Sequence, residues 1–161
     1  MSALEDHIPE SLSPLVEDIV LIQNHLNAYC HAVDRGTLEE VAALFHTDAV
    51  MTPAFQGGDP LHGRDAIRAW YANYNLYYRS DKVQYLRHQI TTPSIQVNGV
   101  EATSTCYFDA DLLDLEKKES FRVYGRYDDK LVKEGDRWVF MDRVIHGYYA
   151  HPITEYTMME G

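Results

Sequence analysis

The sequence predicts an α+β domain in which a curved antiparallel sheet and N-terminal helices form a cone, or α+β barrel, around a pocket. Amphipathic helical patterns fill most of the first half of the chain, on both sides of one strand-like segment. From residue 83 onward the apolar residues recur at every second position instead, which is the period of half-buried strands. Turn signals divide this half into consecutive strands that are expected to pair as an antiparallel meander. Because the helices precede this meander, we expect them to pack together on one face of the sheet. A strongly bent sheet closed by helices leaves a cavity, which is the usual place for a small-molecule site.

The helices are predicted from their apolar stripes and their caps. Ser13-Pro14 is a typical start, with an N-cap before a proline in the first turn, and Gly36 fits the end of this helix. The apolar residues between them recur at alternating steps of four and three and form one buried stripe: Leu15, Ile19, Ile22, Leu26, Tyr29 and Val33. Residues 37–40 form a capping box that opens a second short helix. A third helix is expected from Gly63, after a strand-like segment that begins near Ala49.

Four long strands are expected to follow. They are predicted at residues 83–97, with an interruption near Pro93, and at 100–112, 121–132 and 138–149. Asn98-Gly99 favours a tight hairpin between the first two, because both central residues of a type I′ turn need positive φ. We therefore predict one domain over residues 15–150, with a loose N-terminal arm at 1–14 and a C-terminal tail at 151–161.

The composition argues against several classes of partner. The 161 residues include 14 basic and 25 acidic ones, and the net charge of −11 disfavours nucleic acid and anionic membrane surfaces. No apolar run approaches the ~18 residues of a membrane span. The first residues are acidic where a signal peptide is basic, so we expect a cytoplasmic protein. Cys30 and Cys106 have no metal or redox spacing and are expected to be buried, reduced thiols.

Asp34 is the first candidate catalytic residue. It shares one helix face with Leu26 and Cys30, so it extends an apolar stripe at the C-terminal end of the first predicted helix. The helix dipole disfavours a carboxylate there, and Asp34 therefore needs a cationic or hydrogen-bonding partner. The alternative is a frayed last turn in which Asp34 faces water and pairs with Arg35.

His88 is the second candidate catalytic residue. In its predicted strand it lies between Leu86 and Ile90 on one face, which we expect to be the inner face. A core histidine that is satisfied by a single backbone hydrogen bond is the alternative. A histidine that donates one ring N–H to a carboxylate has a fixed tautomer, and its other nitrogen is free to take a proton from a substrate. An Asp34–His88 pair would therefore be a general base.

Further residues are candidates for substrate contacts. Tyr29, Tyr107 and Tyr124 offer hydroxyls that could polarise a carbonyl, although packing alone would also explain each of them. His146 is expected on the inner face of the last strand, with an interface position as the alternative. The eight histidines show no H-x-x-x-H motif and no His–carboxylate set within one element, so no metal site is predicted.

Five segments carry a resemblance to a known family. They are YCHAVDRG at 29–36, LFHTDAV at 44–50, GRDAI at 63–67, YGRYDD at 124–129 and GDRW at 135–138. With these segments the chain resembles the SnoaL-like proteins of the NTF2-like superfamily over roughly residues 15–147. The resemblance implies the α+β cone described above. It also points to the branch of scytalone dehydratase and hexachlorocyclohexane dehydrochlorinase, which use an Asp–His dyad at the places of Asp34 and His88. It thereby implies His88 as the base that removes a proton from carbon, oriented by Asp34.

These observations lead to one expected function and two alternatives. We expect a cofactor-independent lyase or isomerase that removes a proton from a small hydrophobic cyclic substrate and then expels water or halide or moves a double bond, and a dehydratase is the best single description. The alternative among enzymes is a polyketide cyclase, which needs only the same acid–base pair in a differently shaped pocket, or a ketosteroid-type isomerase. A non-catalytic ligand-binding or accessory subunit of the same fold is the alternative from another class. We also expect a homo-oligomer, dimer or trimer, with Tyr85, Tyr127 and Tyr149 at the interface.

Overall fold

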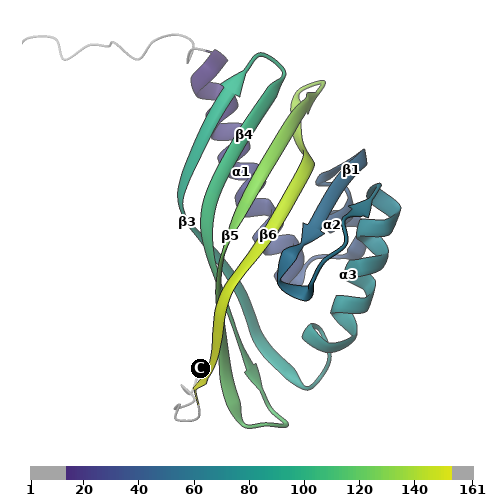
Figure 1. The fold of residues 1–161 in the computed structure, drawn as a ribbon, viewed down its shortest axis with the longest axis vertical. Coiled ribbons are helices and arrows are strands. Elements are labelled where there is room, and N and C mark those ends of the chain that lie inside the picture. Colours follow the sequence, from purple (N-terminus) through teal and green to yellow (C-terminus); the bar gives the residue numbers. More distant parts are fainter. Residues whose placement is uncertain (1–13, 154–161) are drawn as a thin grey trace, which may run out of the picture.

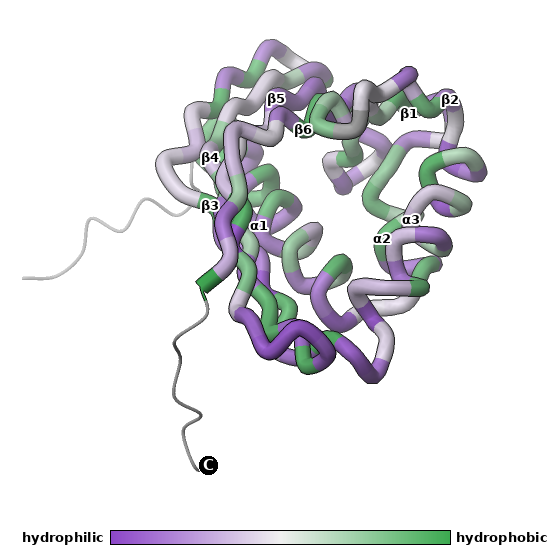
Figure 2. The backbone as a smooth tube through the Cα atoms, turned by 60° about the horizontal axis from the view of Figure 1, so that its bottom comes forward, coloured by the Kyte–Doolittle hydropathy of each residue, from purple (hydrophilic) through white to green (hydrophobic). Residues whose placement is uncertain are grey.

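The computed structural model describes residues 14–153 of the chain (Figure 1). The first part contains α1 (Pro14–Arg35), α2 (Leu38–Ala42), β1 (Phe45–Pro53), the 3-10 helix η1 (Ala54–Gln56), β2 (Leu61–His62) and α3 (Arg64–Tyr78). The second part consists of four long strands, β3 (Val83–Asn98), β4 (Glu101–Asp114), β5 (Glu119–Glu134) and β6 (Arg137–Ile153). Figure 2 shows the strands bending from β3 at the left through β6 to β1 at the upper right, with α2 and α3 next to β1 and opposite β3 and β4. The predicted α+β class is confirmed.

The six strands form one open, mixed sheet in the order β2-β1-β6-β5-β4-β3. The long strands β3 to β6 form the predicted antiparallel meander. One pairing differs from the prediction of a wholly antiparallel sheet, because β1 lies parallel to β6. No hairpin fixes the direction of this pair, since α3 and the whole meander separate the two strands in the sequence. β2 and β3 are the two edges, and the edge position of β3 becomes important for the site.

Several boundaries differ from the sequence prediction. β1 begins at Phe45 rather than near Ala49, and the short β2 was not predicted. β6 continues to Ile153, so residues 151–153 belong to the sheet and not to the expected tail. The expected N-terminal arm, apart from Pro14, and residues 154–161 lie outside the described residues. No helix within residues 14–153 combines the length and the apolar character needed to cross a membrane.

The predicted stripe of α1 forms the centre of the core from Ile22 onward. Ile22, Leu26, Tyr29 and Val33 are all buried, whereas Leu15 near the start of the helix is 53% exposed.

The capping box predicted at the start of α2 is confirmed as well. The Thr37 hydroxyl accepts a hydrogen bond from the Glu40 N–H at 3.1 Å, and the Glu40 carboxylate accepts one from the Thr37 N–H at 2.6 Å.

A β-bulge in β6 decides which side chains of that strand face inward. Phe140 and Asp142 pair with adjacent residues of β5, so Met141 between them is an extra residue. An extra residue shifts the alternation of side chains by one. Phe140 before the bulge and Arg143 after it are therefore both fully buried, although three positions separate them.

His25 on α1 makes the stability of this core dependent on pH. Its Nε2 donates to the Leu44 carbonyl at 3.1 Å, and its ring lies 4.4 Å from that of Phe140. Burial, together with the nearby charge of Arg143, lowers the pKa of His25 to about 4 from 6.5. The unfolded chain therefore binds more protons at this residue between these two pH values, and the contribution of neutral His25 to stability is lost as pH falls. We expect the free energy of unfolding to drop by about 1–3 kcal/mol across this window.

Urea unfolding at pH 7 and pH 4.5 measures this effect. His25→Gln keeps a donor for the Leu44 carbonyl but does not titrate, so its loss of stability over the same range should be smaller than that of the wild type. An equal loss in both proteins would contradict the assignment to His25.

Candidate active site

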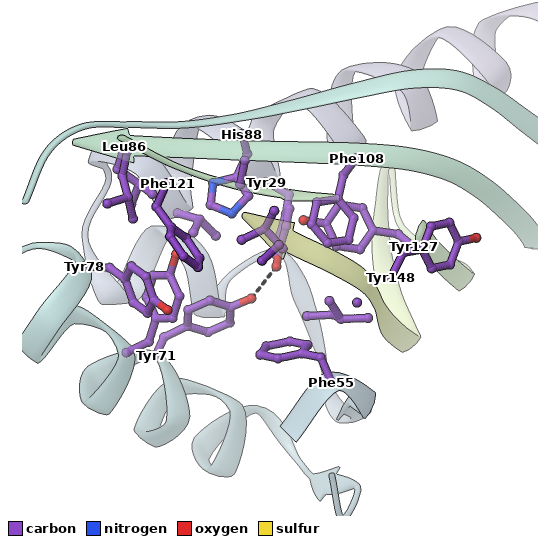
Figure 3. Close-up of a pocket in the computed structure, with 18 of the residues that line it drawn as sticks. Tyr29, Phe55, Tyr71, Tyr78, Leu86, His88, Phe108, Phe121, Tyr127 and Tyr148 are labelled. Atoms are coloured by element: carbon purple, nitrogen blue, oxygen red, sulfur yellow. Dashed lines mark hydrogen bonds between the residues drawn. The ribbon is translucent and has the colours of Figure 1, made fainter. Parts of the chain in front are cut away.

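A cavity of about 400 Å³ opens between the concave face of the sheet, α1 and α3 (Figure 3). This volume falls in the range of small-molecule sites, about 300–1,000 Å³. The residues that line it are mostly aromatic or aliphatic, and none of them is Asp, Glu, Lys or Arg. His88 projects from β3 into this apolar space. The cavity is therefore suited to an uncharged, largely apolar ligand.

Asp34 and His88 meet at the wall of the cavity. Nδ1 of His88 lies 2.6 Å from Oδ1 of Asp34. The backbone N–H of His88 also donates to both carboxylate oxygens, at 3.1 Å to Oδ1 and 2.9 Å to Oδ2. The two side chains are only 10% and 11% exposed. The alternative in which Asp34 pairs with Arg35 in water is wrong, since the Arg35 guanidinium instead contacts His31.

The edge position of β3 explains why this contact forms. An edge strand has alternate N–H groups that no neighbouring strand accepts, and Asp34 accepts the one that belongs to His88. Arg79 at the end of α3 holds the last turn of α1 in place. Its Nη1 donates to the carbonyls of Val33 and Gly36, on either side of Asp34, at 3.2 Å each. The dyad is thus fixed from α1, α3 and β3 together.

The hydrogen bond to Asp34 sets the chemistry of the His88 ring. A carboxylate accepts, so Nδ1 carries the proton and the lone pair lies on Nε2. Because the ring extends into the cavity, Nε2 can take a proton from a bound molecule (Figure 3). Within residues 14–153 no three His, Cys, Asp or Glu side chains are grouped so that they could hold a metal ion.

Two phenols form the second polar feature of the cavity. Tyr29 of α1 and Tyr71 of α3 are each 2% exposed, and their hydroxyl oxygens lie 2.5 Å apart (Figure 3). Burial raises the pKa of both groups, so both are protonated at neutral pH. When Tyr71 donates to Tyr29, the hydroxyl proton of Tyr29 is free for an oxygen of a ligand. The hydroxyl of Tyr71 also lies 3.7 Å from Sδ of Met51, a weak acceptor that competes for its proton.

Aromatic rings form a stacked column along α3. Trp70, Tyr74 and Tyr78 follow one another at four-residue steps, which places them on one helix face. The rings of Trp70 and Tyr74 stack at 5.6 Å and 24°, and those of Tyr74 and Tyr78 at 4.2 Å and 20°. All three line the cavity. None of the three was predicted as a site residue, although their four-residue spacing was the signal that could have found them.

Tyr107 and Tyr124 do not line the cavity, so their assignment as substrate-binding residues is corrected. Phe108 on β4 and Val123 on β5 face the cavity, and the adjacent Tyr107 and Tyr124 therefore point to the outer face of the sheet. Tyr107 is 52% exposed. The ring of Tyr124 packs against that of Tyr149 at 4.8 Å.

His146 is also on the outer face, because the bulge at Met141 reverses the alternation that the sequence analysis assumed. Its Nε2 lies 3.0 Å from Oδ2 of Asp128, so it forms a second His–Asp pair outside the cavity. Tyr127, expected at a subunit interface, is 2% exposed and lines the cavity instead. Tyr85 is 69% exposed, whereas Tyr149 is 62% exposed and also borders the cavity. The expected homo-oligomer stays a prediction.

Comparison with known proteins identifies the family. The SnoaL-like domain family matches residues 14–144, which is most of the chain. The protein belongs to the SnoaL-like family. No curated protein sequence matches this SnoaL-like chain significantly.

Solved structures share the SnoaL-like fold at low sequence identity. A candidate scytalone dehydratase from Novosphingobium aromaticivorans is 22% identical, with a TM-score of 0.73 over 90% of this chain and 91% of the other. A hexachlorocyclohexane dehydrochlorinase is 16% identical, with a TM-score of 0.74 over 91% of this chain and 95% of the other. A candidate aromatic ring hydroxylase from Novosphingobium aromaticivorans is 22% identical, with a TM-score of 0.73 over 85% and 94%. At these identities the likeness shows the fold alone.

Proposed function

We propose that the cavity is the active site of a cofactor-independent acid–base enzyme, and that its reaction is a dehydration. The contact between Asp34 and His88 at the wall of an apolar cavity is the observation that carries this proposal. A pure binding pocket has no need for a nearly buried carboxylate against a histidine, because burying charged groups costs free energy. The dehydratase and dehydrochlorinase among the structural neighbours are consistent with elimination chemistry on this fold.

The proposed reaction starts with the removal of a proton from carbon. Nε2 of His88 takes a proton from the carbon beside a carbonyl, and the C–H electron pair moves to form an enolate whose oxygen becomes negative. This oxygen lies at the Tyr29–Tyr71 pair, which donates a hydrogen bond to it. When the carbonyl reforms, the electron pair expels hydroxide from the next carbon. The hydroxide takes the proton back from the His88 imidazolium and leaves as water.

The chemistry of the walls limits the substrate class. The absence of Asp, Glu, Lys and Arg among the lining residues disfavours a carboxylate or phosphate substrate, since its charge would stay unpaired. The aromatic side chains that line the cavity, among them Trp70, Tyr74 and Tyr78, favour a ring that can contact their edges and faces. We therefore propose a neutral cyclic ketone with a hydroxyl on the carbon next but one to the carbonyl.

A ketosteroid-type isomerase or a polyketide cyclase is the second candidate, and the phenol pair is the observation that favours it. Such enzymes also pass through an enolate, which this pair would stabilise. They differ from a dehydratase in where the electron pair of the enolate goes next. In an isomerase a different carbon is protonated, and in a cyclase the enolate carbon attacks a second carbonyl. The mass of the product separates these outcomes, because only elimination removes a water or a halide ion.

The test is product analysis by mass spectrometry with a panel of neutral hydroxylated, halogenated and unsaturated cyclic ketones. His88→Gln should retain the fold and ligand binding but lose turnover. His146→Gln is the matched control, since His146 forms the outer His–Asp pair, and its turnover should equal that of the wild type. Ligands that bind to the wild type and to His88→Gln without conversion by either would favour the non-catalytic alternative.

A further inference from the structure

Arg143 is a buried cation that the proposed reaction does not yet explain. It is fully buried, and its Nε and Nη2 bind the two oxygens of Asp129 at 2.7 and 2.9 Å. Ser104 donates to the same carboxylate at 3.1 Å. The remaining nitrogen, Nη1, is buried without a hydrogen-bond partner among the described residues. Buried polar atoms are rarely left in this way, so the position of Arg143 requires a reason.

The surroundings of the guanidinium group point to that reason. Its central carbon lies 3.9 Å from the ring centroid of Tyr29, 4.4 Å from that of Tyr127 and 3.8 Å from that of Phe140. Tyr29 is the phenol that contacts Tyr71 in the cavity, whereas Arg143 itself does not line the cavity. A positive charge is thus placed directly behind one of the two phenols that face the ligand.

We propose that Arg143 is a positioning residue that acts through Tyr29. Its charge favours negative charge on the Tyr29 oxygen, so the Tyr29–Tyr71 pair donates a stronger hydrogen bond to an oxygen that becomes negative in the cavity. This role rests on the proposed enolate chemistry. It also explains why the fold retains a buried ion pair, which by itself seldom adds stability compared with apolar residues of similar size.

The electrostatics of Tyr29 agree with this geometry. Burial raises the pKa of Tyr29, whereas the charge of Arg143 and the hydrogen bond from Tyr71 both lower it. The pKa of Tyr71 is raised more than that of Tyr29, because burial raises it and the charge of Tyr29 and the hydrogen bond to Tyr29 raise it again. Tyr29 is therefore the better donor of the two. The other titratable groups around Tyr29 are the thiol of Cys30 and the phenols of Tyr74 and Tyr127.

The test is the titration of 3-fluorotyrosine placed at position 29 of the full chain, followed by fluorine NMR. The label is chosen because its phenol ionises at lower pH than that of tyrosine. The double variant Arg143→Met/Asp129→Leu removes both charges together, so neither is left buried and unpaired. We expect its titration midpoint at position 29 to lie at least about 1 pH unit above that of the unsubstituted protein. Arg143→Lys retains a positive charge and should recover part of the difference.

The outcomes separate this inference from the proposed function, because the titration needs no substrate. An unchanged midpoint in a folded double variant would overturn the role of Arg143 and leave the dyad unaffected. If that double variant does not fold, Arg143→Gln/Asp129→Asn decides, since it also removes both charges but retains polar groups that can hydrogen-bond to each other, and a midpoint equal to that of the wild type would refute the proposal. A shifted midpoint in the double variant, together with no turnover of any compound by the wild type, would support the effect of Arg143 on Tyr29 and count against the proposed enzymatic function. With a substrate in hand, the double variant should lose about tenfold or more in kcat with little change in KM.

Discussion

Asp34→Asn is expected to fold normally and to lose about 10³–10⁴-fold in kcat, as when the aspartate of a Ser-His-Asp triad is changed in the same way. The new amide oxygen can still accept the backbone N–H of His88, so the edge of β3 stays covered. The amide NH₂ group, however, donates to Nδ1 of the ring. This moves the ring proton to Nε2 and removes the lone pair that faces the cavity. The measurement is kcat on the compound that the ketone panel identifies.

Asp128→Asn is the matched control for this prediction. Asp128 contacts His146 on the outer face at 3.0 Å, so the same change is made at a His–Asp pair outside the cavity. Its kcat should remain that of the wild type. If Asp34→Asn retained kcat within a few-fold while folding normally, His88 would not be the base.

Gly125→Ala is expected to have the largest effect on stability, about 3 kcal/mol and about 10 °C in Tm. A Cβ atom at Gly125 would lie 2.1 Å from the backbone oxygen of His146 and 2.4 Å from Cε1 of Phe108. The oxygen belongs to the paired strand β6 and cannot move freely. Phe108 is held as well, because its ring stacks on that of Tyr127 at 4.3 Å and 9°. Thermal and urea unfolding measure the loss.

The same substitution should also affect the cavity, since Phe108 and Tyr127 line it. Gly99→Ala is the control, because a Cβ atom there meets nothing within 4 Å and only the left-handed φ of +63° opposes it. That change should cost about 1 kcal/mol. Equal losses at the two glycines would show that the close approach at Gly125 is not the cause.

Much of the fold could be predicted because its signals are local. The α1 stripe and the Thr37–Glu40 capping box are both present. The hairpin after Asn98 is present too, but its turn differs from the predicted one: Asn98 pairs with Glu101 and only Gly99 has a positive φ, so Gly99 and Val100 are the central residues and the turn is not of type I′. The parallel pairing of β1 with β6 could not be predicted, because no local pattern relates strands so distant in the chain. The short β2 exists only as a partner of β1 and has no periodicity of its own.

The candidate site was predictable wherever the alternation of side chains between the two faces of a strand could be followed from the sequence. Asp34 was expected on the apolar face of the first helix and His88 on the inner face of its strand. The structure brings these two residues, 54 positions apart in the sequence, into contact. For Tyr107 a signal was present, since the apolar Cys106, Phe108 and Ala110 around it alternate on the opposite face. For His146 no signal was present, because the bulge at Met141 leaves no trace in the sequence. The same bulge turns Arg143 inward, and Arg143 was therefore not predicted as a buried residue.

The central claim is that Asp34 fixes the His88 ring with its proton on Nδ1 and its lone pair on Nε2. Long-range ¹⁵N NMR of the imidazole rings tests this most directly, with His88 identified by the loss of its signals in His88→Gln. In the neutral ring of the wild type we predict a pyrrole-type Nδ1 and a pyridine-type Nε2, and the reverse in Asp34→Asn. A wild-type ring that carries its proton on Nε2 would contradict the account, because no base would then face the cavity.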